Sequence, residues 1–107
     1  MSFSLDDLSG LIQSRRSDQA STSYTKSLFD AGVSRIAKKF GEEAVEAVIA
    51  AIEGDRTALT SEAADVLYHL LVLLEARNIA LSDVVTELER RTSQSGHAEK
   101  AAREDVR

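Results

Sequence analysis

Two short clusters of acidic residues carry the chemistry that this sequence is best suited to perform. The first is Glu42-Glu43-Ala-Val-Glu46, and the second is Glu62-Ala-Ala-Asp65. In each cluster an acid is followed by another three residues later, and on a helix such residues project from the same face. Two such helices packed side by side would aim four carboxylates at one point. Because like charges repel one another there unless a divalent cation neutralises them, the pattern predicts a magnesium site.

A solvated acidic face is the alternative interpretation of these clusters. Glu62 and Asp65 would be favoured without a metal if Ser61, rather than Asp55, were the N-cap of their helix, because the helix dipole attracts negative charge near its N-terminus. However, apolar residues surround both clusters, namely Val45, Val48, Ile49 and Ile52 around the first and Val66, Leu67, Leu70 and Leu71 after the second. Since each cluster interrupts an apolar pattern, we favour a site over a solvated face.

Composition indicates a helical protein of a single domain. The chain has 107 residues, of which 43% are apolar and 29% charged, and these values are typical of a soluble globular protein. Proline is absent and only five glycines occur, which favours helices. Cysteine is also absent, which excludes disulfides, thiolate metal sites and a cysteine nucleophile. We therefore predict an all-α fold, with a core over about residues 4–95 and a charged tail over residues 96–107.

Charge and hydropathy also limit the location and the partners of the protein. The first seven residues carry acid where a signal peptide would carry base, so we do not expect export. The longest apolar run, Val66–Leu74, is too short to span a membrane. A net charge of −5 disfavours a general nucleic-acid binder. The expected location is the cytoplasm, with neither membrane nor nucleic acid as a partner.

The pattern of caps, glycines and apolar residues predicts five helices. Their expected ranges are Leu5–Arg16 with Ser4 as cap, Lys26–Ala31 ending at Gly32, Ser34–Ile52 closed by Gly54, a helix from the Asp55–Thr57 turn to about Asn78, and a last helix capped by Ser82 and continuing through Leu88 to Arg91. Residues Ser17–Thr25 have no apolar period and are expected to form a loop.

The run Val66–Leu74 is apolar nearly all round, so a helix there must be buried on more than one side. Either the helix lies at the centre of a four-helix bundle, or it packs against its copy in a second chain. Because one hairpin of this size covers only one side, we favour a homodimer.

Three segments together resemble the phosphoribosyl-ATP pyrophosphohydrolases of histidine biosynthesis. They are Ser23-Tyr-Thr25, Lys38-Lys-Phe-Gly-Glu-Glu-Ala-Val-Glu46 and the stretch from Glu62 to Leu74. The paired EExxE and ExxD motifs alone identify only the all-α nucleotide pyrophosphohydrolase superfamily, which includes MazG-like proteins. The resemblance extends to Ser95-Gly96 and to residues 99–103. The loop before Ser23 lacks the family's usual proline and glycine, and His97-Ala98 replace a bulkier, more acidic pair.

The resemblance implies cleavage of the α–β phosphoanhydride of phosphoribosyl-ATP by water, which gives phosphoribosyl-AMP and pyrophosphate. Magnesium prefers carboxylate, phosphate and water oxygens, and Mn²⁺ could substitute for it. Its expected ligands, which are also the catalytic residues, are Glu43, Glu46, Glu62 and Asp65. Glu42 is either a fifth ligand or an acceptor for a water on the metal. Direct attack by water needs no serine, cysteine or histidine nucleophile.

Basic and hydroxyl side chains are the candidates for substrate binding. Lys38 and Lys39 precede the first acidic cluster by one turn, and Lys100 and Arg103 form a pair in the tail. Each of these is alternatively a solvated cation. Ser23 and Thr25 either donate to a phosphate or ribose, or cap the short helix that follows. His69 lies inside the apolar run, so we expect a hydrogen-bonded core or interface residue rather than a catalyst.

Two other functions compete with this interpretation. A house-cleaning pyrophosphatase would use the same chemistry on ordinary or damaged nucleoside triphosphates. A helical dimerisation module would have no activity, and its acids would only increase solubility. The Ser23-Tyr-Thr25 segment and the Glu62–Leu74 stretch argue against the first alternative. The two acidic clusters at metal-ligand spacing argue against the second.

Overall fold

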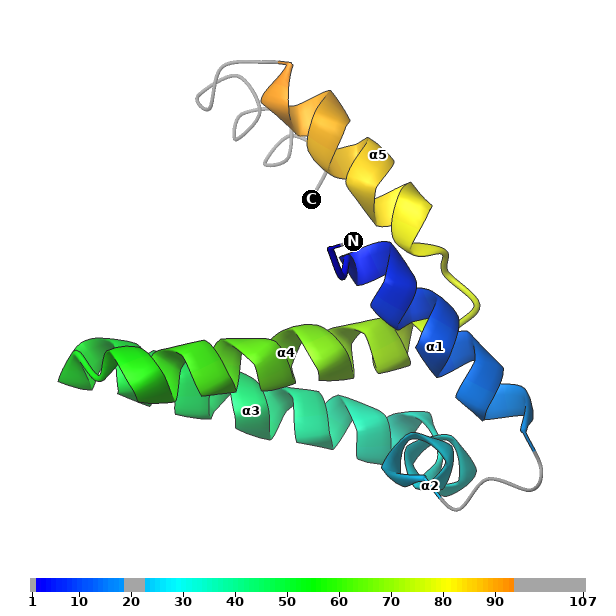
Figure 1. Cartoon of the computed structure of the whole chain (residues 1–107), viewed down its shortest axis with the longest axis horizontal. Helices are drawn as coiled ribbons and strands as arrows, with labels where there is room; N and C mark the ends of the chain where they lie inside the picture. The colour runs from blue at the N-terminus through cyan, green and yellow to red at the C-terminus, as the bar shows by residue number, and fades with distance from the viewer. Residues whose placement is uncertain (1, 19–22, 94–107) are drawn as a thin grey trace.

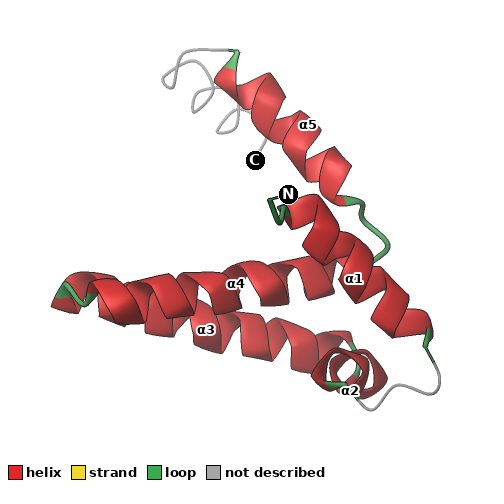
Figure 2. Cartoon of the chain, viewed as in Figure 1, coloured by secondary structure: helices red, strands yellow, loops and turns green. Residues whose placement is uncertain are grey.

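A computed structural model of the protein defines residues 2–18 and 23–93. These residues form five α-helices and no strand (Figures 1 and 2): α1 (Leu5–Ser17), α2 (Tyr24–Ala31), α3 (Val33–Glu53), α4 (Arg56–Ala76) and α5 (Leu81–Thr92). The prediction of an all-α fold is confirmed.

Most of the predicted helix ends are confirmed, and the local chemistry explains them. Ser4 caps α1 and forms a reciprocal capping box with Asp7, which satisfies backbone donors that the first turn leaves free. Asp55 accepts from the backbone N–H of Ala58 and is the N-cap of α4. Gly54 ends α3 in the left-handed conformation, with φ of 74°, which residues with a Cβ rarely adopt.

Two predicted boundaries are wrong. Tyr24 and Thr25 belong to α2 rather than to a loop, because Ser23 caps the helix by accepting from the N–H of Lys26. The N-cap of α5 is Ala80, which makes no side-chain capping bond, so Ser82 lies inside the helix and does not cap it. The presence of Ser82 therefore does not determine where α5 begins.

A long hairpin of α3 and α4 is the main element of the fold, and α1 and α2 pack against one end of it (Figure 1). The core lies where these four helices meet, and its buried side chains are Ile12, Leu28, Ile36, Leu71 and Val72. Arg16 joins three of the helices, because its guanidinium donates to the carbonyl of Glu75 at the end of α4 and lies 5.3 Å from the ring centre of Phe29 on α2. The turn that joins α3 to α4 lies at the opposite end of the hairpin from α1 and α2 (Figure 1).

Several large apolar side chains remain exposed on the hairpin. Val45, Val48, Ile49 and Ile52 follow helical spacing along α3, and between 49% and 81% of each residue is exposed. On α4, Leu71 is buried in the chain's own core, whereas Leu67 is 43% exposed. The uncovered apolar surface predicted from the sequence therefore exists, but α3 contributes more of it than the prediction assumed.

Among the described helices, α4 is long and apolar enough to cross a membrane when judged by length and composition alone. The apolar run Val66–Leu74, on which the prediction of no membrane span was based, is shorter than this helix. However, α4 packs along α3 and carries Glu62 and Asp65 in its first half. Burying those carboxylates in lipid would be strongly unfavourable, so we interpret the apolar surface of α4 as protein-facing.

Candidate active site

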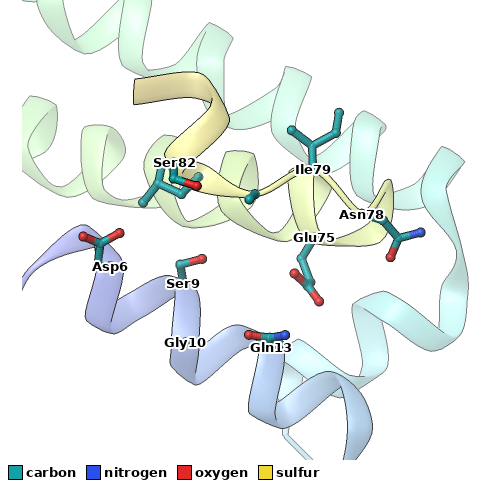
Figure 3. A pocket seen from close by; sticks show the side chains of 10 residues that line it. Asp6, Ser9, Gly10, Gln13, Glu75, Asn78, Ile79 and Ser82 are labelled. Atoms are coloured by element: carbon teal, nitrogen blue, oxygen red, sulfur yellow. The ribbon is translucent and has the colours of Figure 1, made fainter. Parts of the chain in front are cut away.

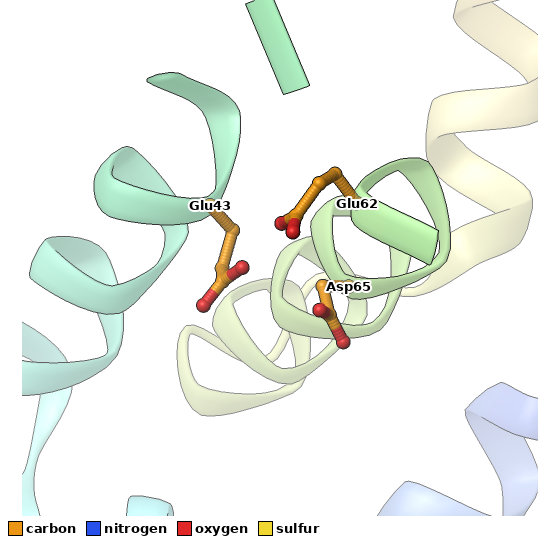
Figure 4. Close-up of side chains that lie close together, drawn as sticks. All are labelled: Glu43, Glu62 and Asp65. Carbon is orange, nitrogen blue, oxygen red and sulfur yellow. The ribbon is translucent and has the colours of Figure 1, made fainter. Parts of the chain in front are cut away.

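Three carboxylates from two helices lie close together near the middle of the hairpin. Glu43 comes from α3, and Glu62 and Asp65 come from α4 (Figure 4). One oxygen atom of each lies within 4.8 Å of the other two, and all three residues are half-buried. Oxygen atoms at this separation can contact one divalent cation, which prefers carboxylate ligands.

The helix-dipole explanation for the second acidic cluster does not apply. Helix α4 begins at Arg56 with Asp55 as its N-cap, so Ser61 is not the cap. Glu62 and Asp65 therefore lie beyond the first turn, where the favourable effect of the dipole has fallen off. Their approach to Glu43 must be stabilised in some other way.

The other two predicted ligands occupy different places. Glu46, one turn after Glu43 on α3, is close enough for its carboxyl group to interact with that of Glu62. Glu42 is exposed, and its carboxylate lies 3.7 Å from the ammonium group of Lys39. The same ammonium lies 3.9 Å from Glu43. Glu46 is thus at the edge of the three-carboxylate cluster, whereas Glu42 faces Lys39.

Electrostatics at Glu62 favour a cation. Its Oε2 atom is enclosed, and no donor in the described part of the chain reaches it. Protonation would allow Glu62 and Glu46 to share a hydrogen bond. This interaction, helped by desolvation and by the charges of Glu46 and Glu43, raises the pKa of Glu62 from 4.5 to about 7. A divalent cation would provide the partner that the charged form lacks, so the residues present fit a metal site.

The raised pKa predicts how pH affects the stability of the metal-free protein. Because Glu62 binds its proton more tightly when folded, its contribution to the free energy of unfolding is largest below pH 4.5 and is lost as pH rises to about 7. We expect Glu62→Gln to raise the thermal midpoint in EDTA by a few degrees at pH 8 and hardly at all at pH 4.5. Thermal denaturation of both proteins at the two pH values measures this. An equal effect at both would contradict it.

Hydrogen bonds tie α2 to α4 one turn after Asp65. His69 is buried, its Nδ1 atom lies 2.7 Å from the carbonyl oxygen of Asp65, and its Nε2 atom lies 3.2 Å from the hydroxyl of Tyr24. Thr25 is also buried, and its hydroxyl is hydrogen-bonded to that of Tyr68. The expectation that His69 is a hydrogen-bonded core residue is confirmed. The hydroxyl groups of Ser23 and Thr25 serve the cap and the core respectively.

The predicted basic residues are distributed unevenly. Lys39 is half-buried beside the carboxylates, and Lys38, at the preceding position of α3, is exposed. Lys100 and Arg103 lie outside the described residues. Arg35, which was not among the predicted site residues, precedes Lys39 by one turn on α3 and lines a pocket with it. Its position four residues before Lys39 places both cations on the same face of a helix, and this spacing could have identified Arg35 from the sequence.

Comparison with known proteins identifies the family of the chain. The family model described as phosphoribosyl-ATP pyrophosphohydrolase matches residues 5–92. A phosphoribosyl-ATP pyrophosphatase of Methylobacterium nodulans is 60% identical over 101 residues, which are 94% of each chain. The enzymes of the same name from Methylobacterium radiotolerans and Agrobacterium fabrum are 58% and 59% identical, again over 94% of each chain. The chain therefore belongs to the phosphoribosyl-ATP pyrophosphohydrolase family.

Proposed function

We propose that this protein is a cytoplasmic enzyme that hydrolyses the α–β phosphoanhydride of phosphoribosyl-ATP to phosphoribosyl-AMP and pyrophosphate, the second step of histidine biosynthesis. The observation that carries the proposal is the approach of Glu43, Glu62 and Asp65 within 4.8 Å in a chain of this family. Relatives that are 58–60% identical over nearly their whole length bear the name of this activity.

The metal in this proposal is Mg²⁺, or Mn²⁺ in its place. Glu43, Glu62 and Asp65 would hold the ion, and Glu46 at the edge of the cluster either completes the ligand set or accepts the proton of the attacking water. Glu42, which faces Lys39, would act at most through a coordinated water. When bound, the ion would neutralise the charge of the triphosphate and polarise the phosphoryl group that water attacks.

One assay tests the proposed function against its rivals. Purified protein with Mg²⁺ is given phosphoribosyl-ATP or one of a panel of ordinary nucleoside triphosphates, and pyrophosphate and orthophosphate are measured separately. We expect rapid release of pyrophosphate from phosphoribosyl-ATP alone. Comparable turnover of ordinary triphosphates would favour a house-cleaning pyrophosphatase. No turnover of any substrate would favour a non-enzymatic dimerisation module.

The C-terminal tail supplies a further prediction. If Lys100 and Arg103 contact phosphate, truncation after Gly96 should raise KM or lower kcat, because two cations that offset the substrate's negative charge are removed. The helical circular-dichroism signal should persist. Steady-state kinetics of the truncated and full-length proteins measure the effect, and unchanged kinetics would leave the tail without a role in binding.

We also propose that the protein is a homodimer with two equivalent sites. The support is the apolar stripe formed by Val45, Val48, Ile49 and Ile52 on α3, together with exposed Leu67 on α4. Symmetric pairing about a two-fold axis is the commonest way to bury such a surface. On a helix Val45 points about 200° round the axis from Glu43, so this interface would cover the side of α3 that faces away from the carboxylate cluster.

A further inference from the structure

A pocket between α2 and α3 lies next to the carboxylate cluster and carries positive charge. Its volume is about 260 Å³, and its lining residues are Tyr24, Ser27, Leu28, Ala31, Arg35 and Lys39. Two of these residues are cations and none is an acid. The pocket therefore suits an anionic group.

One wall of the pocket is fixed relative to the carboxylates. The carbonyl oxygen of Asp65 can only accept a hydrogen bond, so His69 donates to it through Nδ1 and accepts from the Tyr24 hydroxyl through Nε2. The ring of Tyr24 is stacked on that of Tyr68, with 6.2 Å between ring centres. These contacts hold the α2 wall against α4 at the turn that follows Asp65, so the pocket and the cluster form one continuous structure.

The charges along α3 run from the pocket to the cluster. Arg35, Lys39 and Glu43 occupy successive positions four residues apart, which share one side of the helix and are separated by about 6 Å along its axis. Lys39 lies between the other two, because it lines the pocket and its ammonium lies 3.9 Å from Glu43. Arg35 has no carboxylate within ion-pair distance in residues 2–18 and 23–93, so its charge is available to a ligand.

Two other hollows do not have these properties. The hollow between α1 and the start of α5 is lined by Asp6 and Glu75 and by no cation (Figure 3), so it would repel a phosphate. A third is lined by Arg56, Thr57, Thr60 and Ser61 in the first two turns of α4. Among these three hollows in the described part of the chain, the one between α2 and α3 combines two cations with a contact to a candidate metal ligand.

We propose that this pocket binds the β- and γ-phosphates of the substrate, the part that leaves as pyrophosphate, through Arg35 and Lys39. This inference rests on the proposed function. A triphosphate lying along α3 would place its scissile bond at the carboxylates and its terminal phosphates at the two cations. The remaining phosphate of phosphoribosyl-ATP is attached to the second ribose, beyond the adenine ring, and is therefore too far from the scissile bond to occupy a pocket that adjoins the cluster.

Binding of inorganic pyrophosphate to the full-length protein tests this assignment without turnover. Isothermal titration calorimetry is performed with pyrophosphate and Mg²⁺ on the wild type, Arg35→Gln and Arg35→Lys. We expect Arg35→Gln to weaken binding about tenfold or more, because charge-assisted hydrogen bonds to phosphate are lost, and Arg35→Lys to retain part of the affinity. The matched control is Arg77→Gln, which removes an exposed arginine just after α4 and should bind like the wild type.

The outcomes separate this inference from the proposed function. If the wild type hydrolyses phosphoribosyl-ATP but Arg35→Gln binds pyrophosphate as tightly as the wild type does, the pocket assignment is wrong and the function stands. If Arg35→Gln instead loses only the preference for phosphoribosyl-ATP over ATP, the pocket holds the phosphate of the second ribose, and the assignment is again overturned. If the wild type turns over no phosphoribosyl-ATP, the proposed function fails and the substrate assignment fails with it; a tenfold loss of pyrophosphate affinity in Arg35→Gln would then still identify the pocket as an anion site.

Discussion

We expect Glu62→Gln and Asp65→Asn each to lower the turnover of phosphoribosyl-ATP by at least about a hundredfold. The reason is that the charge stabilisation supplied by a bound metal is worth several kcal/mol, and each 1.4 kcal/mol corresponds to a factor of ten in rate. Glu43→Gln should behave similarly, because its carboxylate lies within 4.8 Å of the other two. Steady-state pyrophosphate release at saturating substrate and Mg²⁺ measures the effect.

The control for this prediction is Glu53→Gln, which removes an exposed acid at the end of α3, well away from the cluster in sequence. It should retain wild-type turnover.

Activity of the wild type should vanish in EDTA and return with Mg²⁺ or Mn²⁺. Full activity of both Glu62→Gln and Asp65→Asn would place the site elsewhere on the molecule, and turnover in metal-free buffer would contradict the mechanism itself.

Helical periodicity predicted correctly that acids three residues apart on one helix would face the acids of the other helix. It was not used to ask whether two adjacent acids could do the same. Glu62 and Asp65 are three residues apart and both reach Glu43. Glu42 and Glu43 are adjacent, and adjacent residues on a helix point about 100° apart. Both could not face α4, and the structure turns Glu42 toward Lys39 instead. The same geometry favours the second of the two roles predicted for Glu42, an acceptor for a water on the metal.

Other features depended on contacts between distant parts of the chain, which one sequence does not reveal. Tyr24 and His69 are 45 residues apart, and nothing in either segment predicts that their side chains are hydrogen-bonded. Arg35 became a candidate for ligand binding only in the structure, where residues of α2 and α3 together line a pocket. Likewise, the run Val66–Leu74 showed that α4 needs cover on several sides, but not that Leu71 would be covered by the chain's own core.

The second large effect concerns assembly. We expect the wild type to have twice the 11.6 kDa mass of one chain in solution, and Val48→Asp or Ile52→Asp to have the mass of one chain. Leaving an apolar side chain exposed forgoes about 1.5–3 kcal/mol relative to burying it. The α3 stripe contains four such side chains, and their sum is a large share of the 5–15 kcal/mol by which small domains are stable. A buried aspartate would reverse that gain and add the free energy of desolvating a charge.

Light scattering at micromolar concentration measures the masses, and pyrophosphate release measures the consequence for activity. Ser14→Asp, which places the same charge at an exposed position on α1, should remain a dimer with wild-type activity. The α3 variants should lose activity together with the dimer, because an unpaired and charged α3 loosens the hairpin whose two helices hold the carboxylates together. A wild type that is monomeric and fully active would show that the apolar stripe has another partner and that each chain holds a complete site.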